Sequence, residues 1–541
     1  MDIDTLILGS DPNALACAAS LANQGQKVVI LERRDSAGGV FAREGGLPWR
    51  TPLRPRMRRE LGLLDEAPLD PVAFCPLSDG NHFTLWQDVE KTRQELARLS
   101  QSDAQRYAGY KGFMDRMIAF AEPLLDQTPV GPDAEHWASL VDAANIGLRF
   151  KNLSQADALG LMRLGPMAVQ DFLEEWFEHP AILGALAMQA FEGRFAGPRS
   201  PGTAATLLYH QLAGPRVAVG SVVEDLVAAG TRRGVEIRFG QELESILVEV
   251  GRCTGVRLKD GTVVRATRVV SALDPKRTFL ELVPPLELGP EFVRNVANLK
   301  MRGSTALVRL KLSRAPRFAC LGEQDPAPYL KGRIHFGPDI EALERAYDDV
   351  KYGKLSGRPV LEGRFSEPGQ LDLRVKFVPF GCSEDVKERV LSSLEAYLPD
   401  LRECLQEVVV KTPSDFQAEY GLSGGHLHQG EHNLHQLHFC RPLPGYADYS
   451  SPVERLFLCG SGCHPGGVGT GAAGANAARE IMASNLDRAK SAVSTPVGAG
   501  LAVGTGVALM GVGALVASLV KKPKKEKGKQ ARNNGHKKPL S

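Results

Sequence analysis

The chain has 541 residues, a length that suits three or four domain-sized units, and 43% of them are hydrophobic and 24% charged, as in a globular protein. Its nine cysteines are odd in number and scattered without framework spacing, which excludes a disulfide scaffold and favours a reducing compartment. The net charge of +2 hides an asymmetry, because residues 521–541 hold nine Lys/Arg and one Glu whereas the rest of the chain is acidic.

The N-terminal residues predict a strand at 5–8, a helix at 15–24 and a second strand at 27–31. A glycine turn follows the first strand, and Glu32 ends the second, about twenty residues after the turn. This βαβ pattern is typical of a dinucleotide-binding domain, in which the acidic residue holds a ribose hydroxyl. The segment before the first strand carries no basic n-region, so we expect no secretory signal peptide.

The middle of the chain changes from helices to strands. Helical spacing of apolar residues predicts a helix at 102–125 and another at 167–191, with a break at Pro180. Runs with strand composition, one pair of them joined by the turn Lys259-Asp260-Gly261, predict strands at 235–239, 246–250, 255–258, 263–266, 268–271, 301–312 and 371–379.

Near the C-terminus an apolar strand ends at Gly460, and a glycine-rich turn leads into a helix of small residues at 472–484. Glycines let backbone approach a flat ligand, and the start of a helix offers free N–H groups and a positive dipole end. That combination suits the electron-rich N1 and C2 carbonyl edge of a flavin. An ordinary glycine-rich turn between a strand and a helix has the same composition.

Five stretches carry a resemblance: Glu32-x5-Gly38-Gly39, residues 271–280, 421–425, 441–449 and the turn at 459–474. Together they resemble the phytoene-desaturase-like FAD oxidoreductases, and in particular the branch of pyridine nucleotide-disulphide oxidoreductase domain-containing protein 2. The resemblance spans residues 4–482. It implies that FAD binds in an extended pose and that the flavin faces an apolar channel. The expected cofactor-binding residues are Gly9, Ser10, Asn13, Ala14, Glu32, Arg33, Gly38, Gly39, Leu243, Gly460, Ser461, Gly466, Gly467 and Val468.

The resemblance also implies an α/β fold in which a two-dinucleotide-binding, Rossmann-like FAD domain is discontinuous in sequence. A mixed α+β substrate domain interrupts it. The expected division of the chain is an FAD-binding domain at 1–85, 211–285 and 451–490, a helical substrate or membrane-facing region at 86–210, a substrate domain at 286–450, a glycine-rich apolar segment at 491–520 and a basic tail at 521–541.

Departures from the family's pattern lie mainly at the phosphate end. Asp11 and Ala14 stand where the Gly-x-Gly-x-x-Gly fingerprint has its second and third glycines, and Val217-Ala218 replaces a glycine pair. Alanine is tolerated at the third position, whereas Asp11 would place a carboxylate beside a pyrophosphate and weaken FAD binding. Alternatively, Asp11 simply caps the helix, with Pro12 in the first turn.

Histidines gather in one loop, and five of the twelve lie between His426 and His438. Their spacings can hold a transition metal, but the family has this loop without the histidines and without a metal, so we expect no metal site. The loop is expected to border the substrate channel, with imidazoles that titrate near neutral pH.

His464 is the candidate catalytic residue, because it is the one titratable imidazole inside the glycine-rich turn. By family position it faces the flavin edge, where it could move a proton or shape the pocket. The alternative is a turn histidine bonded to backbone. The sequence contains no Ser-His-Asp set, zinc site or redox Cys-x2-Cys, so the nucleotide cofactor is the expected electron sink.

The C-terminal residues predict attachment to a membrane. Residues 491–520 carry no charge, Val497 to Val520 is long enough to span a bilayer, and Gly500-x3-Gly504-x3-Ala508 is a small-residue stripe. We expect a tail anchor, with the basic tail held by anionic lipid and the main domain in the cytoplasm. A span would carry the basic tail across the membrane against the positive-inside tendency. A shallow or re-entrant segment and a flexible linker therefore stay open as alternatives.

Two functional hypotheses follow. The first is an FAD-dependent oxidoreductase of the desaturase or dehydrogenase type, which takes hydride from a long apolar substrate, such as a polyene or isoprenoid, at a membrane. The second is a degenerate flavoprotein fold that serves as a membrane-attached binding or scaffolding protein. Glu32 and the intact turn at 460–474 favour the first, and Asp11 with Val217-Ala218 favours the second. No nucleic acid partner is expected.

Overall fold

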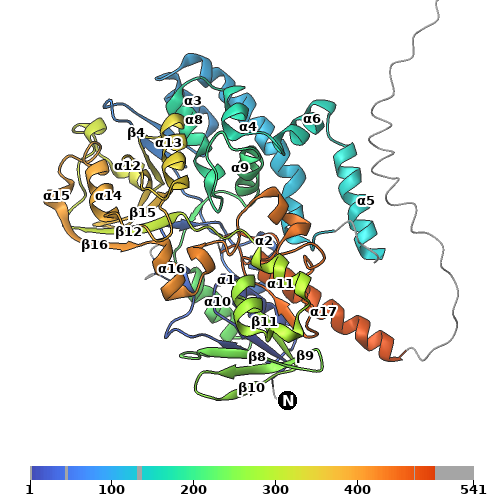
Figure 1. Cartoon of the computed structure of the whole chain (residues 1–541). Helices are drawn as coiled ribbons and strands as arrows, with labels where there is room; N and C mark the ends of the chain where they lie inside the picture. The colour runs from blue at the N-terminus through green and yellow to red at the C-terminus, as the bar shows by residue number, and fades with distance from the viewer. Residues whose placement is uncertain (1–2, 43–44, 46, 131–136, 468, 494–541) are drawn as a thin grey trace, which may run out of the picture. The chain divides into compact units, whose positions relative to one another are not determined.

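The computed structural model of the chain describes residues 3–42, 45, 47–130, 137–467 and 469–493 (Figure 1). The chain divides into two units, Met1–Asn485 and Leu486–Ser541. Apart from the end of the last helix, all of the elements below belong to the first unit.

A five-stranded parallel sheet forms the base of the first unit. It has the order β17-β11-β1-β2-β7, and every neighbouring pair is parallel. Its inner strands are buried along their whole length, as expected where helices cover both faces of a parallel sheet. The strands come from three separate parts of the chain, so the expected discontinuity of this domain is observed: β1 (Thr5–Leu8), β2 (Val28–Leu31), β7 (Glu236–Arg238), β11 (Arg268–Ser271) and β17 (Leu456–Leu458).

Two small sheets accompany the parallel one. The predicted hairpin region forms a three-stranded antiparallel sheet of β8 (Leu243–Glu249), β9 (Arg252–Leu258) and β10 (Val263–Arg265), seen at the bottom of Figure 1. A short ribbon pairs β3 (Trp49–Arg50) with β6 (Val217–Ala218).

The second large sheet has seven strands in the order β16-β12-β15-β14-β13-β4-β5. Its neighbours are antiparallel except for β13 and β4. The strands are β4 (Ala73–Pro76), β5 (His82–Leu85), β12 (Thr305–Leu312), β13 (Ile334–Phe336), β14 (Val360–Glu367), β15 (Gln370–Lys376) and β16 (Leu405–Lys411).

Strands β4 and β5 fall within the expected FAD-binding segment at 1–85, and they extend the seven-stranded sheet. Phe74 is fully buried in the core of that sheet, and its amide donates to the carbonyl of Arg333 at 2.8 Å. The expected division of the chain into domains stays a prediction.

Helices surround both large sheets. The expected break at Pro180 is observed, because α8 begins at that residue. The predicted helix at 102–125 is shorter: α4 ends at Ala121 and continues as a 3-10 turn at Glu122–Asp126, where Pro123 has no amide to donate. The helices used below are α1 (Pro12–Ala22), α2 (Pro55–Leu61), α3 (Val89–Ala97), α4 (Gln101–Ala121), α5 (Trp137–Lys151), α7 (Val169–Glu174), α8 (Pro180–Ala187), α9 (Thr203–Leu212), α10 (Val222–Thr231), α13 (Ile340–Lys351), α16 (Pro413–Tyr420) and α17 (Ala472–Val493).

The predicted membrane anchor at 497–520 and the basic tail at 521–541 lie outside the described residues. Within the part of the chain that the structure describes, none of the helices is both long and apolar enough to cross a bilayer.

Candidate cofactor site

A cleft opens at the carboxyl ends of β1, β2 and β11, with a free volume of about 860 Å³ including the part open to solvent. The carboxyl edge of a parallel sheet is where ligands bind in such folds. Predicted site residues line the cleft from four separate segments. These are Gly9, Ser10, Glu32, Arg33, Gly38, Gly39, Leu243 and Ser461.

Glu32 is held in place by two hydrogen bonds at the end of β2. The Ser10 hydroxyl donates to its Oε2 at 2.6 Å, and the Arg34 amide donates to its Oε1 at 2.9 Å. The Gly38 amide donates to the carbonyl of Ser10 at 2.9 Å, which fixes the glycine pair beside the first turn. Gly38 has φ +99°, and a Cβ there would lie 2.6 Å from Val223, so only glycine fits.

Asp11 is the N-cap of α1, as the second of the two readings predicts. Its carboxylate accepts from the Ala14 amide at 2.8 Å, and Pro12 occupies the first helical position. Burial raises the pKa of the Asp11 carboxyl to about 6. A carboxyl with that pKa is partly protonated near neutral pH, which reduces the repulsion that an adjacent phosphate would feel.

The N-terminal helix and the C-terminal turn meet at the floor of the cleft. The Asn13 side-chain amide donates to the Ser461 hydroxyl at 3.0 Å, and both residues are buried. A Cβ at Gly474 would lie 1.9 Å from the carbonyl of Asn13, so α17 packs directly against α1 only because this residue is glycine. Segments 448 residues apart thus form one surface.

Gln429 is a site residue that the sequence did not indicate. Its side chain lines the cleft, donates to the carbonyl of Ala272 at 3.0 Å and accepts from the amide of Gly462 at 3.0 Å. It therefore joins the end of β11 to the turn after β17. A lone glutamine in a loop has no spacing signal, and its role emerges only from the fold.

The turn at the flavin end is built from backbone. Gly466 and Gly467 have φ +81° and +90°, and with Pro465 they line a second cavity, with about 300 Å³ of free volume including the part open to solvent. The Tyr209 hydroxyl on α9 donates to the carbonyl of Pro465. The other residues around this cavity are Thr51, Arg54, Leu125, His210, Ala213 and Thr470. The predicted residue Val468 lies outside the described residues.

His464 is bonded to backbone. Its Nε2–H donates to the carbonyl of Leu124 at 2.9 Å, and its buried Nδ1 has no partner among the described residues. Burial lowers the pKa of this imidazole to about 3. The contact matches the structural alternative, and a catalytic role for His464 stays a prediction.

The histidine loop differs from the expectation of groups that titrate near neutral pH. Burial lowers the pKa of His426 to about 4 and holds the pKa of His428 and His432 well below the usual range, so all three are neutral at pH 7. His435 is exposed. In the described part of the chain, no three His, Cys, Asp or Glu side chains come together as a possible metal site.

The residues of the two cavities fit FAD. The cleft offers the buried carboxylate of Glu32, beside the turn between β1 and α1, for a ribose. Gly9, Ser10 and Ser461 leave room for a pyrophosphate, and the guanidinium groups that line the cleft are those of Arg33, Arg34 and Arg277. The buried Asn13 Oδ1 has no partner there. The glycine turn lets a flat ring approach the start of α17. Asp11 is a group in the cleft that opposes binding.

The chain belongs to the family of flavin-containing amine oxidoreductases, whose model matches residues 15–482, and its cofactor is FAD. It is 29% identical to the rat pyridine nucleotide-disulfide oxidoreductase domain-containing protein 2, over 89% of this chain and 93% of that protein. It is 24% identical to a limonene dehydrogenase chain of Castellaniella defragrans and 26% identical to a neurosporene-forming phytoene desaturase of Cereibacter sphaeroides. Both matches cover 88% of this chain. They cover 94% of the limonene dehydrogenase chain and 93% of the phytoene desaturase.

Solved structures share the fold. An oxidoreductase from Methanosarcina mazei has a TM-score of 0.53 at 14% identity, covering 89% of this chain and all of that one. A putrescine oxidase has a TM-score of 0.51 at 15% identity, covering 90% and 99%.

Proposed function

We propose that the protein is an FAD-dependent oxidoreductase of the desaturase or dehydrogenase type, which removes hydride from a carbon–carbon unit of a long apolar substrate such as a polyene or isoprenoid. The observation that carries the proposal is the cavity at the Pro465–Gly467 turn. Its walls include Leu125, Ala213 and Tyr209 beside polar Thr51, Arg54 and Thr470. His210 is neutral there, because burial lowers its pKa to about 4. Two relatives are named for limonene and phytoene, which are isoprenoids, and this supports the same class.

The side chains around this cavity position groups rather than exchange protons. FAD supplies the acceptor for two electrons when bound. Tyr209 and His464 hold the turn through carbonyls of Pro465 and Leu124. Arg54 is the one charged side chain among the described lining residues, and it is paired with Glu122 and Asp126 at 3.0 and 2.9 Å. Formation of a double bond removes a hydride and a proton. Loss of the hydride leaves a carbocation, whose neighbouring C–H is acidic enough to give its proton to water, so no strong base is needed and this environment suits the reaction.

A degenerate, non-catalytic fold is the second candidate. Asp11 and Val217-Ala218 are the features that favour it. Each has a local structural role, because Asp11 caps α1 and Val217–Ala218 forms β6, which pairs with β3. Structural roles of this kind explain both departures without a loss of the cofactor.

We also propose that the main domain works in the cytoplasm beside a membrane, attached through residues 491–541. Flotation of the full-length protein with anionic vesicles, compared with a variant that ends at residue 490, tests this. Both proteins should fold and load FAD, and only the full-length one should float. A full-length protein that stays in the bottom fraction at low and high salt contradicts the attachment.

The enzymatic proposal is tested by anaerobic bleaching of the bound flavin with polyenes, isoprenoids and acyl chains, and with amines as the contrasting class. Gly467→Val should lose FAD and activity, because its branched side chain enters the cavity from a residue at φ +90°. Gly353→Val is the matched control, since it has similar strain at φ +73° in open space. Bleaching by amines but by no apolar chain would overturn the proposed substrate class.

His464→Ala should keep FAD, and it separates the two readings of that residue. A general acid or base contributes about 10²–10⁴-fold, so a slowing of bleaching below about tenfold assigns His464 to the architecture of the turn.

A further inference from the structure

A third cavity lies between the seven-stranded sheet and the histidine loop, with about 450 Å³ of free volume including the part open to solvent. Four cationic side chains and a single carboxylate are among its described lining residues. These are Arg194, Arg302, Arg374, Lys376 and Glu192; His426 and His428 complete the polar wall.

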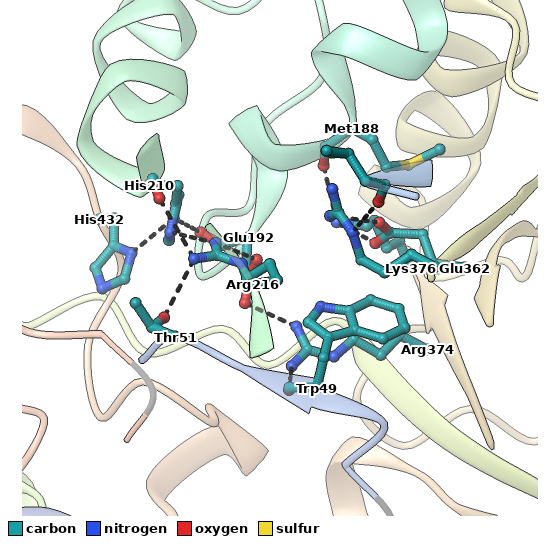
Figure 2. A network of polar contacts seen from close by, with 12 residues as sticks. Trp49, Thr51, Met188, Glu192, His210, Arg216, Glu362, Arg374, Lys376 and His432 are labelled. Carbon is teal, nitrogen blue, oxygen red and sulfur yellow. Dashed lines mark hydrogen bonds and ion pairs between the residues drawn. The ribbon is translucent and has the colours of Figure 1, made fainter. Parts of the chain in front are cut away.

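Behind this wall, carboxylates are outnumbered by cations. Glu192 is shared by Arg216 and Arg374, at 2.9 and 2.7 Å (Figure 2). Glu362 is 2.9 Å from Lys376 and 3.9 Å from Arg333. All of these side chains are at most 10% exposed. Burial would raise the pKa of both carboxyls, but the adjacent cations hold them well below their usual range, so both are ionised.

No other group among the described residues balances the remaining charge. The neighbouring imidazoles His210, His335 and His428 have lowered pKa values because they are buried, and they are neutral. The spare donors of the cations go to carbonyls: Arg374 to Trp49 at 2.6 Å and Lys376 to Met188 at 2.9 Å. Carbonyls satisfy the hydrogen bonds but carry no net charge. Two positive charges therefore lack a counter-ion, an arrangement that is costly in a low-dielectric interior.

Unpartnered nitrogens provide the second observation. His428 lines the cavity, is 4% exposed, and its Nδ1 has no hydrogen-bond partner among the described residues. Arg374 also lines the cavity and is 4% exposed, and its Nε has no hydrogen-bond partner among the described residues. Native proteins leave few such groups unpaired, and a missing ligand is one explanation for them.

We propose that this cavity binds a small oxyanion, a carboxylate or a phosphate, and that the group is the charged end of the substrate. The substrate is then an apolar chain that ends in an acid rather than a pure hydrocarbon. This step rests on the proposed function. An oxyanion between Arg374 and Lys376 would supply the missing counter-charge and accept charge-assisted hydrogen bonds.

Aromatic rings lie between this cavity and the turn at Pro465–Gly467. His428 and His432 have ring centroids 4.6 Å apart, and His432 Nδ1 lies 3.2 Å from His210 Nε2. The ring of Tyr209 is 4.9 Å from that of His432, and Tyr209 and His210 both line the cavity at Pro465–Gly467. A layer of neutral rings thus lies between the proposed anionic subsite and the apolar subsite.

The test measures ligand-induced thermal stabilisation of the full-length, FAD-loaded protein. Hexadecanoate and hexadecyl phosphate are compared with hexadecan-1-ol, all below their micellar concentrations, and with inorganic phosphate. We expect one of the acids to raise Tm and to bind at least about tenfold more tightly than the alcohol. Arg374→Gln should abolish that preference and still fold, because Glu192 keeps Arg216. Should it fail to fold, Arg302→Gln, half-exposed on the cavity wall, provides the second measurement.

Arg309→Gln is the matched control, since Arg309 lies on the same sheet but pairs with Asp372 away from the cavity. Equal binding of acid and alcohol, an unchanged preference in Arg374→Gln, or stabilisation by inorganic phosphate alone overturns the proposal. Bleaching of the flavin by hydrocarbons without any acid preference also overturns it and leaves the proposed function intact. Acid binding without bleaching by any chain overturns the proposed function and, with it, the assignment of the anion to the substrate, and leaves only the oxyanion site.

Discussion

The two large sheets of the first unit offer different kinds of chemical groups to a ligand. At the five-stranded parallel sheet the contacts are glycine backbone, helix starts and short side chains such as Ser10, Asn13 and Ser461. Beside the seven-stranded sheet they are long charged side chains, held inside the core by one another (Figure 2). A backbone site depends on shape, whereas a site of buried charges depends on the protonation of its neighbours. The two should therefore respond differently to acid and to substitution.

A fall in pH should distinguish the backbone-built site from the site of buried charges most strongly. Buried imidazoles stay neutral in the folded protein, with pKa values of about 4, 4 and 3 for His210, His426 and His464, whereas unfolded histidines take up a proton below about pH 6.5. Stability is thus full above pH 6.5 and is lost as pH falls toward 4, by about 1.4 kcal/mol per histidine between pH 7.5 and 5.5. Asp11, whose folded pKa is raised to about 6, opposes this in the same window.

Urea unfolding at pH 7.5, 6.5 and 5.5 measures this loss. His435→Gln is the control, because that side chain is exposed and should not change the pH dependence. A free energy of unfolding that is the same at pH 7.5 and 5.5 would show that the histidine loop is open to solvent.

Removal of one shared carboxylate should have the next largest effect. Glu192→Gln leaves Arg216 and Arg374 buried without a counter-charge, and should lower the free energy of unfolding by about 3–5 kcal/mol. Arg374→Gln should cost much less, since Glu192 keeps Arg216. Chemical unfolding of both variants at pH 7.5 tests the asymmetry. An equal decrease of the free energy of unfolding in the two variants would mean that the buried cations do not outnumber the buried carboxylates.

The smallest effect is expected in the backbone-built site. Asp11→Asn keeps a side-chain oxygen for the cap of α1 but removes the charge, so stability should change by less than about 1 kcal/mol. FAD affinity should rise severalfold, because a carboxylate no longer faces the pyrophosphate. Equilibrium titration of the apoprotein with FAD measures this affinity. Asp35→Asn, an equal change of charge at an exposed residue, is the control. A similar gain of FAD affinity in Asp35→Asn would mean that the net charge of the protein, and not the position of Asp11, sets the affinity.

The difference between the sheets also explains what the sequence could predict. Strand β11 is predicted to the residue and β2 to within one, because buried parallel strands are short, largely apolar runs. Helix α1 begins three residues earlier than expected, since Asp11 caps it. The network of buried charges is not predicted. Arg374 lies in a predicted strand, whereas Glu192 and Arg216 lie in loops. Nothing in a single sequence indicates that the three converge or that burial keeps the adjacent histidines neutral.

The hydrogen bond between Asn13 and Ser461 has a consequence for biosynthesis. Strand β17 is the last to join its sheet, at the edge beside β11, and Ser461 and the start of α17 follow it directly. A nascent chain can pair β1 with β2 early, but the cleft lacks one wall until more than 460 residues have been translated. Capture of FAD therefore falls at the end of synthesis, and an earlier stop in translation leaves an open, apolar edge that chaperones must cover.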